Sequence, residues 1–344
     1  MEPQTSNFKL QNKSQIPNIK SKTFGYWKLL FVICFEVGCL MLEVPCWAQT
    51  AFDPAGLAIG ARSLGMGGTG AALAEGAETI FNNPAGLGEI DQFNFSSQAG
   101  NVLDDVTFTQ LAGLYPLGQQ GALGLGFAGA YVSGIELRDT AGTLQGKANY
   151  GDALLVGSYG KKLLPELAFG LNLKYYALDG TENNNGDGHG WNLDVGLLQH
   201  GLDWLSLGLV AENILSSNRV AYQNGASEPL PQVVKAGGRM QLFGDSFNSA
   251  VPAPVNLAVL ADLNFALQTS QPLSTHLGAE LAPNQALTLR GGFDGEEMTA
   301  GLSLNFAGLA CHFAYTRLAK YLSLSFNERG WPPEGPAETF LARR

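Results

Sequence analysis

Residues 255–265 read VNLAVLADLNF, and apolar side chains in this stretch alternate with small or polar ones. Residues 167–176, LAFGLNLKYY, repeat the pattern. A period of two is the signature of a β-strand, because successive side chains of a strand point to opposite faces. These two stretches therefore predict strands with two chemically different faces.

Segments of this kind follow one another from residue 93 onward, separated by turn residues. Fourteen can be counted, at residues 93–101, 107–116, 121–132, 153–160, 167–177, 191–200, 205–212, 232–240, 255–265, 274–281, 287–293, 299–305, 309–315 and 320–326. Segments 107–116 and 153–160 alternate least clearly. An even number of antiparallel strands is typical of a closed bacterial barrel. The sequence therefore predicts an all-β protein, a transmembrane antiparallel β-barrel of about fourteen strands.

A soluble β-sandwich would also show this alternation, so the composition of the two faces has to discriminate. One face consists almost entirely of Leu, Val, Phe, Tyr and Ala, whereas the other carries scattered charges among Gly, Ser and Asn. A soluble protein needs a heavily charged exterior, and only 15% of these residues are charged. The pattern favours a barrel whose apolar face meets lipid. A soluble secreted β-protein is the alternative, and it would be released without detergent.

The charged residues of the polar face are expected to line the lumen. They are Lys174, Asp194, Glu212, Lys235, Arg239, Asp262, Glu280 and Arg290. A basic residue on the lipid face instead would cost about 2–4 kcal/mol near the bilayer midplane. Four of these residues are basic and four are acidic, so we expect no strong selectivity for solutes of one charge. A further hypothesis is that these residues bond to the N-terminal region through Arg62 and Glu75 or Glu78.

Residues 1–48 predict a signal peptide, because lysines precede an apolar run that ends near Cys46. The alternative, a membrane-spanning helix, needs about 20 apolar residues with few charges, and Glu36 and Glu43 interrupt the run. Three of the four cysteines lie in this leader, which leaves Cys311 without a partner for an internal disulfide. We expect export to the bacterial outer membrane, with membrane lipid as a partner.

Several function classes are disfavoured by composition. A net charge of −10 argues against a nucleic-acid partner. No arrangement of nucleophile and base accompanies the histidines, so we expect no enzyme, and His276 and His312 are interpreted as lumen-facing wall residues. The loop at residues 183–190, NNNGDGHG, misses the calcium-loop spacing. No metal and no cofactor is expected.

The region between leader and first strand is rich in glycine. Residues 60–74 read GARSLGMGGTGAALA, and residues 78–87 read ETIFNNPAGL. It has too much glycine for a stable helix and is too apolar for a free linker. It suits a compact plug, because glycines let backbone pack closely in a narrow lumen. Asn83 before Pro84 is expected to cap a short helical turn.

These motifs resemble the N-terminal hatch of the long-chain fatty acid transporter (FadL-type) superfamily, and more closely its PorV/PorQ-like branch. The residues that carry the resemblance are Arg62, Met66, Gly67, Gly68, Asn83, Pro84 and Ala85. The resemblance implies a plugged barrel. Together with the patterns above, it predicts four parts, at residues 1–48 (signal peptide), 49–92 (hatch or plug in the lumen), 93–326 (barrel) and 327–344 (periplasmic tail). The chain looks shorter than the classical fatty acid transporters, and its last strand is not its terminus.

Three functions fit this organisation. The first is passive outer-membrane transport of hydrophobic small molecules. The second follows from the PorV/PorQ-like branch, which resembles components of type IX secretion, where the barrel docks or shuttles secreted proteins. The third is a barrel with a structural role and no transport.

Overall fold

The computed structural model describes residues 53–56, 60–74, 76–102, 105–180, 187–202, 204–244, 255–267, 273–306, 308–317 and 319–327. The chain separates into residues 1–44 and 45–344, and all described residues belong to the second unit. The predicted signal peptide and residues 328–344 of the predicted tail lie outside the described residues. No helix in the described part of the chain is long and apolar enough to cross a membrane.

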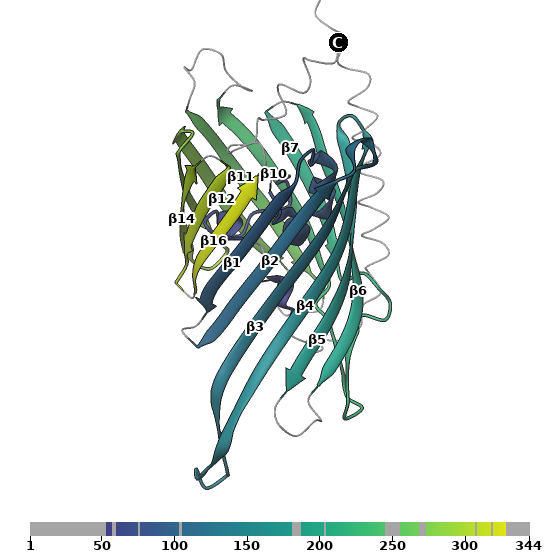
Figure 1. The fold of residues 1–344 in the computed structure, drawn as a ribbon, viewed down its shortest axis with the longest axis vertical. Helices are drawn as coiled ribbons and strands as arrows, with labels where there is room; N and C mark the ends of the chain where they lie inside the picture. The colour runs from purple at the N-terminus through teal and green to yellow at the C-terminus, as the bar shows by residue number, and fades with distance from the viewer. Residues whose placement is uncertain are drawn as a thin grey trace, which may run out of the picture. The chain divides into compact units, whose positions relative to one another are not determined.

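Sixteen strands form one antiparallel sheet, and fourteen of them close into a ring (Figure 1). The ring consists of β1 Asn94–Val102, β2 Val106–Pro116, β3 Ala122–Arg138, β4 Leu144–Leu164, β5 Leu167–Gly180, β6 Gly188–Leu202, β7 Leu205–Glu212, β10 Val233–Phe243, β11 Asn256–Ala266, β12 Leu273–Asn284, β13 Leu287–Phe293, β14 Met298–Phe306, β15 Leu309–Tyr315 and β16 Ala319–Asn327. The first strand pairs with the last, from Asn94 opposite Asn327 to Val102 opposite Ala319. The predicted barrel of fourteen strands is confirmed.

The largest difference from the sequence prediction lies in β3 and β4. Residues 133–152 are predicted as a loop, but β3 runs to Arg138 and β4 begins at Leu144. This hairpin extends well past its neighbours in Figure 1, and residues 133–141 are exposed on both faces. Alternation disappears where neither face is buried, so the sequence carries no period-two signal there.

A second hairpin lies within the predicted loop 213–231. Strands β8 Arg219–Tyr222 and β9 Ser227–Pro229 pair with each other. β8 also joins the sheet through Gly188 and His189 of β6. Strands this short give too few residues for a periodic pattern to be recognised.

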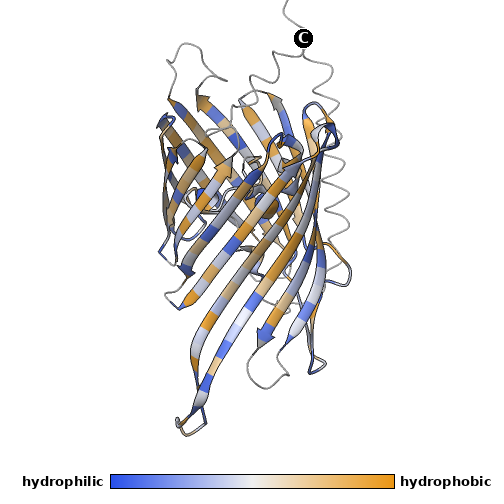
Figure 2. Cartoon of the chain, in the orientation of Figure 1, coloured by the Kyte–Doolittle hydropathy of each residue, from blue (hydrophilic) through white to orange (hydrophobic). Residues whose placement is uncertain are grey.

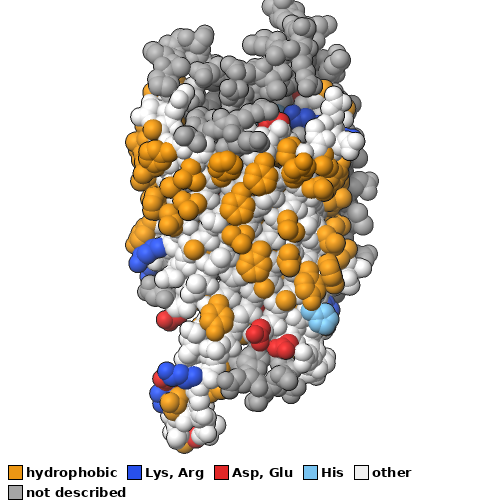
Figure 3. All heavy atoms as spheres, in the orientation of Figure 1, with side chains coloured by type: hydrophobic (Ala, Val, Ile, Leu, Met, Phe, Trp, Pro, Cys, Tyr) orange, Lys and Arg blue, Asp and Glu red, His pale blue; other side chains and the backbone are white. Residues whose placement is uncertain are grey.

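The outward face of the barrel is apolar. On β11, Leu263 and Phe265 are 42% and 41% exposed, whereas the alternate residues Leu260 and Asp262 are buried. Figure 2 shows this alternation along many strands, and Figure 3 shows a broad apolar band around the visible face. An apolar exterior over a small, polar inner face is the arrangement of a membrane barrel.

The inner face differs from the prediction on β2 to β4. Phe108, Leu114, Leu154 and Val156 point inward and are buried, although small or polar residues were expected on that face. The inner faces of β2 and β4 mix large apolar side chains with polar ones such as Gln110, which explains why these two predicted strands alternate poorly. The buried core therefore lies inside the ring, on this side of it.

In the described part of the chain before β1, four short helical turns are present. They are η1 Pro54–Gly56, α2 Ala61–Leu64, α3 Thr79–Asn82 and η2 Pro84–Glu89. The side-chain oxygen of Asn83 accepts a hydrogen bond from the backbone N–H of Ala85 at 3.0 Å, which is the predicted cap. We call the described residues from Asp53 to Gln92 the N-terminal segment. Figure 1 shows its helical turns enclosed by the strands.

Candidate functional site: the contact of the N-terminal segment with the inner wall

The inner wall, meaning the strand residues that face into the ring, lacks side chains where the backbone of the N-terminal segment approaches it. A methyl group on Gly208 of β7 would overlap the carbonyl oxygen of Ala71, and one on Gly170 of β5 would overlap the backbone of Pro84. A methyl group on Gly292 of β13 would likewise overlap the backbone nitrogen of Gly67. Wall glycines therefore shape the surface that receives the segment.

Further wall glycines repeat this relationship around the ring. Their missing side chains leave room for atoms of the segment at Gly124, Gly126, Gly160, Gly196, Gly278 and Gly301. Gly124 and Gly126 face the side chains of Ile80 and Phe81.

The residues that carry the resemblance to a hatch lie at these contacts. Met66 is fully buried against Gly278 of β12. Gly67 and Gly68 have φ values of 71° and 77°, which only glycine adopts readily. The backbone N–H of Gly67 donates to Thr299 Oγ1 of β14 at 2.9 Å. Pro84 and Ala85 lie beside the wall glycines of β5 and β6.

An ionic network joins the segment to β12 and β13. Arg62 donates from Nε and Nη2 to the two carboxylate oxygens of Glu280, at 2.9 and 2.7 Å. Arg290 donates from Nε to the same carboxylate at 2.7 Å, and also to the hydroxyl of Ser303. His312 continues the network, with Nδ1 2.5 Å from the Ser303 hydroxyl and Nε2 2.8 Å from Ser325 Oγ. Bidentate arginine–carboxylate bonds of this kind are strong and geometrically specific.

Asp262 and Asn83 hold the middle of the segment through its backbone. Asp262 Oδ2 accepts the N–H groups of Gly70 and Ala71 at 2.7 and 2.9 Å. Asn83 Nδ2 donates to the carbonyl oxygen of Ala71 at 2.6 Å and to that of Leu197 on β6 at 3.0 Å. His276 Nδ1 lies 2.7 Å from the carbonyl oxygen of Gly67. These bonds satisfy backbone groups that would otherwise be buried without partners.

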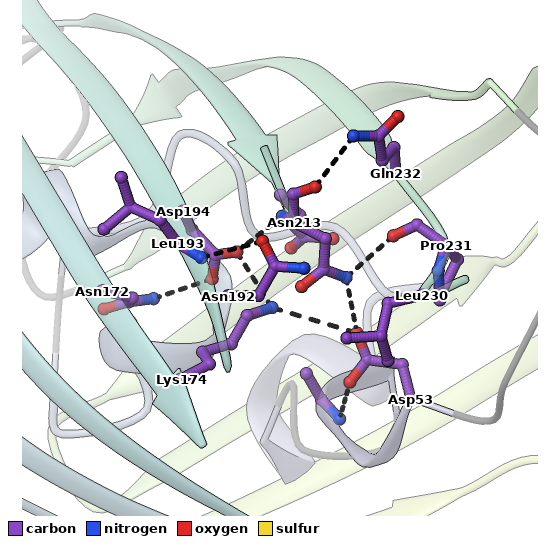
Figure 4. Close-up of polar contacts among 12 residues, drawn as sticks. Asp53, Asn172, Lys174, Asn192, Leu193, Asp194, Asn213, Leu230, Pro231 and Gln232 are labelled. Carbon is purple, nitrogen blue, oxygen red and sulfur yellow. Dashed lines mark hydrogen bonds and ion pairs between the residues drawn. The ribbon is translucent and has the colours of Figure 1, made fainter. Parts of the chain in front are cut away.

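Figure 4 shows a second polar cluster, which binds the start of the segment. Lys174 Nζ lies 2.9 Å from Asp194 Oδ1 and 3.9 Å from Asp53 Oδ2. The hydroxyl of Tyr176 lies 3.0 Å from the same Asp53 oxygen, and Asn213 Nδ2 donates to it at 2.9 Å. Lys174 is 2% exposed, so its ammonium group depends on these carboxylates for compensation.

Asn213 donates hydrogen bonds to both carboxylates of this cluster. It follows β7 with φ of 58°, a left-handed conformation that asparagine tolerates better than most residues. Its N–H donates to Asp194 Oδ1 at 2.9 Å, and its side chain also donates to the carbonyl oxygen of Pro231 at 2.7 Å. The sequence analysis did not single out Asp53, Tyr176 or Asn213. An Asn directly after a strand was the available signal.

The other predicted charges have different surroundings. Glu212 and Lys235 pair with each other at 2.7 Å. Arg239 donates to Gln241 on its own strand at 2.9 Å. Glu78 accepts a hydrogen bond from Ser323 of β16 at 3.1 Å, and Glu75 lies outside the described residues. Burial raises the pKa of Glu78, against the opposing effects of the Ser323 hydrogen bond and of the charges on Arg62 and Arg290.

A few polar side chains of the inner wall have no hydrogen-bond partner. The set includes both amide atoms of Gln98 on β1 and of Gln110 on β2, and the hydroxyl of Ser96. An unpaired buried polar group costs about 1–3 kcal/mol of stability. Within the described ranges, no group of three His, Cys, Asp or Glu residues is arranged to hold a metal ion.

Solved structures with the same architecture include two toluene transporters. The Pseudomonas putida toluene transporter TodX is 15% identical, with a TM-score of 0.52, over 83% of this chain and 98% of that one. The Ralstonia pickettii toluene transporter TbuX is 16% identical, with a TM-score of 0.51, over 82% and 99%. The chain shares its fold with toluene transporters.

The CymD monoaromatic hydrocarbon channel gives a similar result, with 14% identity and a TM-score of 0.51 over 80% of this chain and 97% of that one. No protein-family model matches the sequence, and no curated protein matches it. At these identities the likeness concerns the fold, and the function has to be argued from the residues of this chain.

Proposed function

We propose that this protein is a FadL-like outer-membrane channel for the passive passage of hydrophobic small molecules, with the N-terminal segment as its plug. The apolar exterior suits a lipid environment. The fold shared with toluene transporters supports a channel for apolar solutes. The resemblance of the Arg62 and Asn83 motifs to the hatch of fatty acid transporters supports the role of the segment.

The observation that carries this proposal is the division of the inner wall into an apolar side and an ionic side. Phe108, Leu154 and Val156 belong to one buried apolar cluster that also contains Ile80 and Phe81 of the segment. The ion pairs of Glu280 lie on β12 and β13, which are not adjacent to β2, β3 or β4 in the ring. An apolar wall suits a hydrophobic solute, while the ionic wall holds the plug.

In this structure the apolar side is closed. Phe108 and Leu154 have no exposed surface, because they belong to the buried cluster that contains Ile80 and Phe81 of the segment. Passage therefore requires the segment to move away from the apolar wall. The bonds of Arg62 to Glu280 on β12 allow a partial shift in which α2 stays attached.

Uptake by reconstituted vesicles tests the proposal. Vesicles with lipopolysaccharide in the outer leaflet are required, because apolar solutes cross a plain phospholipid bilayer without a protein. Labelled toluene is expected to enter protein-containing vesicles faster than protein-free ones. A charged solute of similar size, benzoate, serves as the control. Equal toluene entry in both kinds of vesicle would contradict the proposal.

The secretion hypothesis predicts another result. If the barrel docks secreted proteins, it should co-purify with exported cargo and leave toluene uptake unchanged. Localisation is tested separately by fractionation, where the proposal requires recovery in the outer membrane and cleavage of the leader near residue 48. Release of a monomer without detergent would support the soluble alternative instead.

A further inference from the structure

Two glutamines face each other on the inner wall at the seam where the barrel closes. Gln98 of β1 is directly opposite Gln110 of β2, and Gln98 is also opposite Ser323 of β16. Their side chains are 2% and 1% exposed. All four amide atoms of this glutamine pair lack a hydrogen-bond partner, and so does the hydroxyl of Ser96 on the same face.

Other buried amides of the wall are bonded through at least one atom. Asn172 Nδ2 donates to the carbonyl oxygen of Ile80 at 2.9 Å, and Asn305 Nδ2 donates to that of Gln285 at 3.0 Å, although Asn305 Oδ1 has no partner. Buried polar groups are generally paired, since an unpaired one is costly while an apolar group of the same shape is not. Leucine would fill the space of either glutamine without that cost. Packing alone therefore does not account for two amides at this place.

The glutamine pair adjoins an aromatic corner. Phe108 and Tyr321 meet edge to face, with ring centroids 6.0 Å apart and planes at 85°. Both rings lie opposite Gly100, so they sit one step along the wall from the amides on the same face. On the other side of Gln110 the cross-strand neighbour is Ala128. A flat ring with one polar substituent matches an aromatic corner beside two amides.

The charges around the glutamine pair favour a neutral polar group. The residues directly opposite the two glutamines, Ser323 and Ala128, are uncharged. The carboxyl group of Glu78 bonds to Ser323, so an anion beside Gln98 would lie near a carboxyl group. Each amide offers a donor and an acceptor. A hydroxyl group, which also donates and accepts, can satisfy one atom of each glutamine.

We propose that Gln98 and Gln110 form a subsite for the hydroxyl group of a neutral hydroxylated aromatic molecule, whose ring packs beside Phe108 and Tyr321. This inference rests on the proposed function and narrows its substrate class. Because the glutamine pair is covered in this structure, the ligand reaches it when the segment, which is bonded to the neighbouring Ser323 through Glu78, shifts from the wall.

Phenol and toluene provide a matched pair of probes, since they differ only in hydroxyl against methyl. Their affinities for the purified full-length protein are measured by competition in detergent, and the ratio of the two affinities is the readout. In the double variant Gln98→Leu/Gln110→Leu, the affinity for phenol relative to that for toluene should fall by about two- to tenfold, as loss of one neutral hydrogen bond gives. Differences in partitioning between the two probes cancel when the variants are compared.

Gln241→Leu is the control, because Gln241 is also buried on the inner wall but is bonded to Arg239 and to the carbonyl oxygen of Phe243. The control variant should keep the ratio of the parent. If the double variant does not fold, isotope-labelled glutamine side-chain amides in the parent supply the test. Resonances of Gln98 and Gln110, assigned from the single leucine variants, should shift with phenol and not with toluene.

An unchanged affinity ratio in the folded double variant, or amide resonances that phenol leaves unmoved, would overturn the subsite. Both results are expected if the two amides bind only water and no ligand. Failure of the proposed function is distinguishable, since it shows as absent toluene uptake in vesicles while phenol binding in detergent still depends on the two glutamines.

Discussion

Arg62 of the N-terminal segment and Glu280 of β12 form a bidentate ion pair that is largely buried, with side chains 8% and 13% exposed. The carboxylate is shared, because Arg290 of β13 also donates to it at 2.7 Å. Glu280 of the wall therefore pairs with two guanidinium groups, of which only Arg62 belongs to the segment. This makes Glu280 the residue whose loss should most weaken the attachment of α2.

We predict that Glu280→Gln loosens α2 from the wall. Removing one partner of a buried pair leaves uncompensated charge and costs about 3–5 kcal/mol. Hydrogen exchange at the Leu64 and Gly65 amides, which are bonded within this turn, should accelerate. Glu136→Gln is the matched control, because the Arg138–Glu136 pair is about half exposed and should contribute at most about 1 kcal/mol. Equal exchange in the two variants would show that the buried pair does not anchor α2.

Two adjacent glycines of β13 give a second prediction. A methyl group on Gly292 would overlap the backbone of Gly67, while one on Gly291 would meet nothing within 4 Å. Gly292→Ala should therefore displace the segment and increase its cleavage by a protease added to the purified protein. Gly291→Ala should leave cleavage as in the parent. If Gly292→Ala is cleaved no faster than Gly291→Ala, the close contact at β13 is not needed to seat the segment.

The sequence predicted the ring because period-two alternation survives wherever one face meets lipid. It failed at residues 133–141, where both faces of the β3–β4 hairpin are exposed. It was also wrong about the inner face near Phe108 and Leu154, since lumen-facing residues were taken to be small or polar. An inner face that packs against an apolar segment is itself apolar, and the alternation then weakens.

The site was predictable only in part. Composition and alternation predicted which charges face inward, because lipid would not tolerate them on the other face. The partners of these charges depend on which strands are neighbours, and those strands are far apart in sequence. A bond of Arg62 to Glu280 could therefore not be distinguished from one to Glu212 or Asp262. Asp53 and Tyr176 were missed, since neither stands out until the segment and β5 are brought together.

Lys174 provides the third prediction. Its ammonium group lies between Asp194 and Asp53, so Lys174→Met leaves two buried carboxylates without a cation. The start of the segment should detach, at a cost of about 3–5 kcal/mol, and exchange of the Ala55 amide should accelerate. Adding Asp194→Asn should restore part of the protection, because it removes one of the uncompensated charges. A double variant as exposed as the single one would show that charge is not what holds Asp53.

The turn between β3 and β4 gives a prediction about pH. Asp139 accepts hydrogen bonds from the Thr143 and Ala141 N–H groups at 2.8 and 2.9 Å and from Gln145 at 2.9 Å. The bond from Thr143 contributes most to lowering the pKa of Asp139 below its ordinary value, which is about 4. A carboxyl group with a lowered pKa stabilises the folded turn above the unfolded pKa, and this contribution is lost as pH falls through the folded pKa.

The Thr143 amide should therefore lose protection from hydrogen exchange on acidification below about pH 4, after correction for the intrinsic pH dependence of exchange. In Asp139→Asn protection should be lower at neutral pH and should not change over this range, and a variant that still titrates would assign the effect to another group.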